Sequence, residues 1–66
     1  MRFGIDVPKQ YIHSIESFCE NNNFEYDFYN LASVHIDQVA EIHFYKKEHQ
    51  EKAAAFLHRL VELDRE

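Results

Sequence analysis

Three segments of the chain alternate between apolar and polar residues, which is the pattern of half-buried β-strands. The first covers residues 2–7, the second residues 24–29 and the third residues 34–45. In the third segment, Gln38 is the one polar residue on the otherwise apolar side. The alternation therefore predicts three strands, each with one apolar and one polar face.

Two further segments carry apolar residues at the spacing of an amphipathic helix. We expect the first helix to begin at residues 6–8, with Asp6 as its cap and Pro8 in its first turn, and to end at residues 21–23. Its apolar positions are Tyr11, Ile12, Ile15, Phe18 and Cys19. The second helix runs from Glu48 onward, with a stripe that is apolar until its last turn. That stripe consists of Ala53, Phe56, Leu57, Leu60, Val61 and Asp64.

The order of these elements is β-α-β-β-α, which predicts an α+β fold with a three-stranded sheet and two helices on one face. A helix joins the first two strands, so they should run parallel through a right-handed crossover. The second and third strands should form a hairpin. Placing the third strand between the other two gives a split β-α-β arrangement, the architecture of a ferredoxin-like fold lacking its fourth strand. This analogy is architectural and carries no function.

The third strand is long for a domain of this size. Twelve residues of strand span about 40 Å, so the strand should either bend or project toward a second subunit. A turn at Asp37 and Gln38 would instead divide it into two strands. Two-residue hairpin turns favour Gly or Asn, so this alternative is the less favoured.

Length and composition are those of a small globular protein. The 66 residues predict a single domain, 1–66, with a thin margin of stability that self-association would widen. Cys19 is the only cysteine, which excludes an internal disulfide. The start lacks the apolar core of a signal peptide, and the longest apolar run is too short for a bilayer. Together these features predict a soluble, cytoplasmic protein with no membrane partner.

The net charge of −5 is unevenly placed along the chain. No Lys or Arg lies between Lys9 and Lys46, and that gap holds six carboxylates. Binding to nucleic-acid phosphates needs a basic face, so this layout argues against direct nucleic-acid binding. It allows a basic protein partner, a cation, or no role beyond solubility.

The polar sides of the strands meet on the sheet face that we expect to lie away from the helices. Only even hairpin registers keep the strand faces matched, and two such registers are expected. One pairs Glu25 with Asp37, which brings Asp27 opposite His35. The other pairs Asp27 with Asp37, which brings Tyr29 opposite His35. Either register opposes two carboxylates, at a cost of a few tenths of a kcal/mol or more.

Four interpretations of this acidic face follow. In the first interpretation the face is simply solvated, and His35 relieves the repulsion between the carboxylates. It is a metal site, with Asp27, His35 and Asp37 as three N/O ligands; His43 lies too far along the strand to join them. It binds a basic protein, with tyrosines as anchors and carboxylates steering association. Finally, the first strand is an open edge that would pair with a second copy in a homodimer.

The sequence contains no catalytic motif and predicts neither an enzyme nor a cofactor. The function we expect is a small acidic protein-binding or regulatory module of inhibitor, antitoxin or adaptor type. A metal-binding protein and a dimeric small-ligand-sensing domain are the alternatives. The expected partner contacts are Glu25, Asp27, Tyr29, His35, Asp37, Glu41 and Tyr45.

Overall fold

A computed structural model describes residues 2–30 and 39–65. Within them the chain forms strand β1 (Phe3–Pro8), a 3₁₀ turn (Lys9–Tyr11), helix α1 (Ile12–Asn21) and strand β2 (Tyr26–Asn30). Strand β3 (Val39–Phe44) and helix α2 (Lys47–Asp64) follow. The α+β class expected from the sequence is confirmed.

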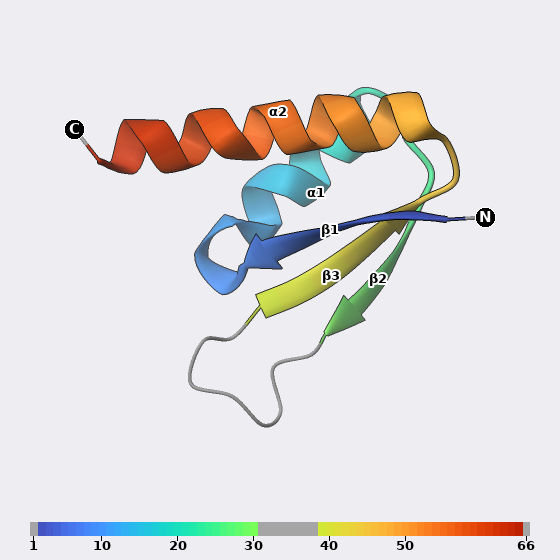
Figure 1. Ribbon diagram of the computed structural model, residues 1–66, viewed down its shortest axis with the longest axis horizontal. Coiled ribbons are helices and arrows are strands. Elements are labelled where there is room, and N and C mark those ends of the chain that lie inside the picture. The colour runs from blue at the N-terminus through green and yellow to red at the C-terminus, as the bar shows by residue number, and fades with distance from the viewer. Residues whose placement is uncertain (1, 31–38, 66) are drawn as a thin grey trace.

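The three strands form one antiparallel sheet in the order β1-β3-β2. The central place of β3 is the one expected from the sequence. Because β1 and β2 each run antiparallel to β3, they run parallel to one another, also as expected. Both helices lie on the same side of the sheet, with α2 extending along it (Figure 1).

The face of the sheet under the helices is apolar and forms the core. Its cross-strand pairs include Phe3 with Phe44 and Val7 with Ala40. The fully buried members of the core are Val7, Ile15, Cys19, Ile42, Phe44 and Ala53. Every apolar position expected on the two helices belongs to this cluster or packs against it. The helical period therefore identified the buried faces correctly.

Asp64 is the polar residue at the end of the apolar stripe of α2, and the structure gives it a partner. The hydroxyl of buried Tyr11 donates a hydrogen bond to the Asp64 carboxylate. This bond joins the end of the 3₁₀ turn to the last turn of α2. It also raises the pKa of Tyr11, because a carboxylate acceptor favours the protonated phenol.

The expected start of the first helix is wrong. Pro8 is the last residue of β1, opposite Val39, and its φ of −58° and ψ of 145° are extended. Proline is tolerated there because β1 is an edge strand, where a missing N–H breaks no ladder bond on the open side. Asp6 consequently lies within β1 rather than capping a helix, and neither described α-helix has a side-chain hydrogen bond at its N-cap.

The expected end of the first helix is confirmed. Asn23 has a φ of 58°, the left-handed conformation that asparagine tolerates better than most residues. The backbone N–H of Phe24 donates to the carbonyl of Cys19, and the Asn22 side chain donates to that of Phe18. These bonds satisfy carbonyls that the end of α1 would otherwise leave open.

The start of the long third strand and the divided-strand alternative fall on residues 31–38, outside the described residues. Among the described residues, neither helix is long and apolar enough to cross a bilayer.

Candidate functional site

The sheet face away from the helices carries the charged residues expected there. We call it the outer face, and define it by Arg2, Gly4, Asp6, Asp27, Val39, Glu41, His43 and Tyr45. Period-two alternation places these side chains opposite the core side of each strand. Arg2 precedes β1 and Tyr45 follows β3.

The registers expected for the hairpin are both wrong. Asp27 lies opposite His43, and Tyr29 lies opposite Glu41. The strands therefore pair eight or six residues further along β3 than expected. His43, expected to lie too far along its strand to join a site with Asp27, faces Asp27 directly. His35 and Asp37 lie outside the described residues, so their expected roles at the site stay predictions.

Asp27 is held by two neighbours from the other strands. Arg2 Nη1 lies 2.8 Å from Asp27 Oδ2, and the hydroxyl of Tyr45 donates to the same oxygen at 2.7 Å. The guanidinium of Arg2 also lies over the Tyr45 ring, 5.4 Å from its centroid. This Arg2–Asp27–Tyr45 cluster ties the ends of all three strands together on the outer face.

The cluster perturbs the Tyr45 phenol. Its hydrogen bond to Asp27 raises the pKa of Tyr45, and partial burial and the charges of Asp27 and Glu25 raise it further. Arg2 acts in the opposite direction by favouring the phenolate. Tyr45 therefore stays a neutral donor around physiological pH, with part of its ring open to solvent.

A second contact on the outer face joins His43 to Glu41, two positions apart on β3. The His43 ring lies over Gly4 of the neighbouring strand, where an added Cβ would come within 3.1 Å of His43 Cδ2. Gly4 thus provides the room that the imidazole occupies. Neither Gly4 nor His43 was expected at the site, although the alternation of β1 and β3 placed both on this face.

Opposed carboxylates do occur, but across a different strand pair from the expected one. Asp6 on β1 lies directly opposite Glu41 on β3. Asp6 is exposed and forms no ion pair with another described residue. Like charges directly opposite each other destabilise an antiparallel pair by a few tenths of a kcal/mol or more. This part of the outer face therefore carries two directly opposed carboxylates, of which Glu41 also contacts His43.

The described residues do not assemble a metal site. They contain no group of three or more His, Cys, Asp or Glu side chains placed to hold an ion. Of the three expected ligands, Asp27 is engaged by Arg2 and Tyr45, and His35 and Asp37 lie outside the described ranges. The expected metal site therefore stays a prediction.

A small hollow borders the outer face beside Tyr45. It measures about 110 Å³ and is lined by Asn23, Glu25, Tyr45, Lys46 and His49. Pockets for small molecules usually measure about 300–1,000 Å³. His49 stacks on Phe24 with ring centroids 4.2 Å apart, and this contact positions the ring at the start of α2. The hollow is too small for a drug-sized ligand.

Comparison of the chain with protein-family models, with curated proteins and with solved structures finds no match.

Proposed function

We propose that this chain is a small acidic protein-binding module whose outer face docks a basic protein partner. The observation that carries the proposal is the direct opposition of Asp6 and Glu41 across β1 and β3. A lysine or arginine from a partner, placed between the two carboxylates, would replace their repulsion with two attractive contacts.

The surroundings of the two carboxylates suit a protein interface. Tyr45 is 43% exposed and is held in place by Asp27 and Arg2. Its side chain would therefore lose little conformational entropy when a partner docks. Tyrosine and arginine are enriched at the centres of interfaces. Exposed Glu25 adds negative charge beside Tyr45, which would help to steer a basic partner.

The module we propose belongs with inhibitors, antitoxins or adaptors, which act by surface complementarity and need no catalytic group. We also propose that its β-α-β-β-α architecture is that of a ferredoxin-like fold without the fourth strand, and that it works in the cytoplasm.

A homodimer formed through a sheet edge is a second part of the proposal, and two observations favour β2 over β1 as that edge. The carbonyl of Gly4 on β1 accepts a hydrogen bond from Gln50 of α2 at 2.9 Å, which occupies an acceptor on that strand. On β2, Phe28 is 41% exposed although its neighbour Ile42 is fully buried. Edge pairing through β2 would cover this phenylalanine.

A titration with a defined probe tests the outer face. Isotope-labelled protein is titrated with a dodecapeptide rich in Lys and Arg, and binding is followed by the amide shifts of β1 and β3. We expect saturable shifts centred on Asp6 and Glu41 that weaken steeply with added salt.

Two variants of equal net charge distinguish binding at the outer face from attraction to the net charge of the protein. Asp6→Asn with Glu41→Gln should weaken binding at least tenfold, whereas Glu20→Gln with Glu51→Gln, on the exposed surfaces of α1 and α2, should leave it unchanged. If both variants weaken binding equally, the peptide senses only net charge and the docking surface is wrong.

A further inference from the structure

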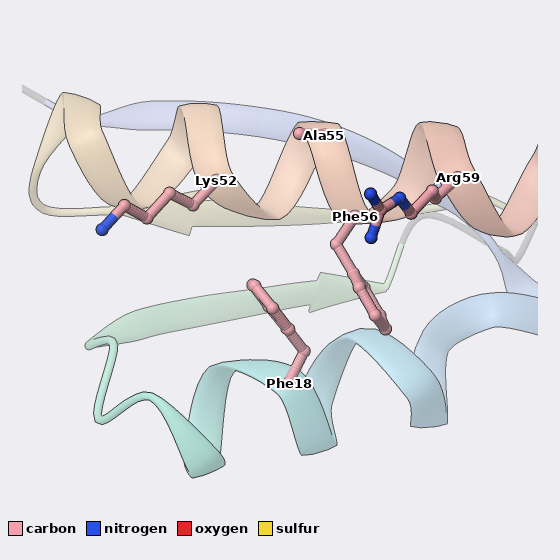
Figure 2. Close-up of a pocket in the computed structure, with 5 residues that line it drawn as sticks. All are labelled: Phe18, Lys52, Ala55, Phe56 and Arg59. Carbon is pink, nitrogen blue, oxygen red and sulfur yellow. The ribbon is translucent and has the colours of Figure 1, made fainter.

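Two adjoining hollows lie along the junction of α1 and α2. The first, of about 340 Å³, is lined by Phe18, Lys52, Ala55, Phe56 and Arg59 (Figure 2). The second, of about 450 Å³, shares Phe18 and Phe56 and continues along α1 past Ser14 and Ser17. Because the two phenylalanines line both hollows, we treat them as one feature, the interhelical groove.

The floor of the interhelical groove is formed by a pair of stacked aromatic rings. The rings of Phe18 and Phe56 stack with their centroids 4.3 Å apart and their planes 10° from parallel. Phe24 packs edge-on against Phe18, with ring centroids 5.8 Å apart, and this contact helps to fix the Phe18 ring. Both floor residues are only partly buried, so an incoming apolar side chain would find a preformed surface.

The rim of the groove is basic, in contrast to the acidic chain as a whole. Lys52 and Arg59 extend from α2 on either side of Phe56 (Figure 2). They are seven residues apart, or about 10 Å along a helix axis. Lys52 pairs with exposed Glu48 at 3.2 Å, and Arg59 forms no ion pair with a described residue. No carboxylate of the described residues lines either hollow.

We propose that the interhelical groove binds an acidic peptide segment of a partner protein. An apolar anchor residue of that segment would rest on Phe18 and Phe56, and carboxylates on either side of the anchor would reach Lys52 and Arg59. Arg59 suits this role because its guanidinium can hold a carboxylate through two parallel hydrogen bonds. The length of the groove, which continues along α1, matches a peptide better than a small molecule.

This second surface is independent of the outer face. The two surfaces have opposite charge and lie on different elements, so each should select a different partner. A module with both surfaces would join a basic protein to an acidic one. If the proposal for one surface fails its test, the proposal for the other surface is unaffected.

The test begins with a random dodecapeptide library displayed on phage and selected against the wild-type protein. Enriched peptides are synthesised, and their affinities are measured for wild type and two variants of equal charge. The groove variant is Lys52→Gln with Arg59→Gln, and the control is Lys46→Gln with Lys47→Gln at the start of α2. All four positions are exposed, so both variants should fold, which circular dichroism verifies.

We expect enriched peptides with an apolar residue flanked by Asp or Glu, bound at least tenfold more weakly by the groove variant than by the control. Replacing the anchor residue of the peptide with serine should also weaken binding at least tenfold. The proposal is overturned if no acidic peptide is enriched, or if the groove variant binds the enriched acidic peptides as tightly as the control does.

Discussion

The two faces of the sheet use the same three strands in different ways. Under the helices, Ile42 and Phe44 are fully buried and contact apolar residues of both neighbouring strands. On the outer face, Glu41 and His43 of the same strand contact each other, and the nearby cluster of Arg2, Asp27 and Tyr45 is joined by polar bonds. Neighbouring residues of β3 therefore belong alternately to the packed core and to the polar contacts of the outer face.

The difference indicates which face of the sheet supplies most of the stability of the fold. Burial of apolar area contributes far more free energy than exposed ion pairs, whose typical worth is within about 1 kcal/mol. The outer face can therefore change its side chains at little cost to folding, which leaves it free to meet a partner. Its opposed carboxylates, Asp6 and Glu41, even act against the fold.

The largest expected effect is the loss of a core side chain. Phe44→Ala should lower the free energy of unfolding by about 3–5 kcal/mol, because it removes a buried ring and leaves a cavity. His43→Ala, one residue away on the outer face, should cost less than about 1 kcal/mol. Urea denaturation of the two variants measures both values. Equal losses would contradict the division between the faces.

The next effect depends on pH and concerns Cys19, which is fully buried. Burial, with smaller contributions from Glu16 and Glu20, raises the pKa of the Cys19 thiol from 9.0 to about 11. The unfolded chain therefore loses this proton at lower pH than the folded chain does. The stabilisation is complete below about pH 9 and is lost as the pH rises toward about 11.

Cys19→Ala isolates this contribution, because tyrosine titrations are common to both proteins. The urea midpoint of wild type should fall more steeply than that of the variant between about pH 9 and pH 11. Parallel pH profiles for the two proteins would show that the thiol is not protected by the core.

A smaller effect is expected at the cluster on the outer face. Asp27→Asn removes the charge that pairs with Arg2, and should cost no more than about 1 kcal/mol because both groups are partly exposed. The same change should lower the pKa of Tyr45, since the Asp27 carboxylate is the main cause of its elevation. Ring-carbon NMR of Tyr45 follows that titration. Asp6→Asn, which removes a carboxylate outside the cluster, is the control.

The smallest effect is expected at Gly4. Gly4→Ala places a Cβ 3.1 Å from His43 Cδ2, so the ring must move by a few tenths of an ångström. Alanine also reduces the entropy lost by glycine on folding, so we expect a net change within about 0.5 kcal/mol. The ring signals of His43 and the amide of Glu41 should shift, whereas core amides should not. Unchanged His43 signals would show that the ring does not rest on Gly4.

The sequence predicted the faces of the elements better than their pairing. A period of two or 3.6 identifies the buried side of each element, and those of α1, α2 and the described parts of the strands are correct. Every even shift of a hairpin satisfies the same alternation, so the pattern alone does not select the pairing of Asp27 with His43. The Asp6–Glu41 opposition was missed for the same reason.

Local signals succeeded or failed according to their tertiary context. The asparagines after α1 ended the helix as expected, because a left-handed residue satisfies a purely local need. Pro8 resembled a helix start, but pairing between β1 and β3 held it in the strand. The interhelical groove was not expected, because Phe18 and Phe56 belong to different helices and their packing depends on the fold.

The most direct test of the central claim is a quantitative capture from the native host's lysate. The baits are wild type, the outer-face variant Asp6→Asn with Glu41→Gln, and the equally charged control Glu20→Gln with Glu51→Gln. We predict a basic protein retained by wild type and the control, released by moderate salt and lost from the outer-face variant. Retention of the same proteins by all three baits would contradict the claim that the outer face is the docking surface.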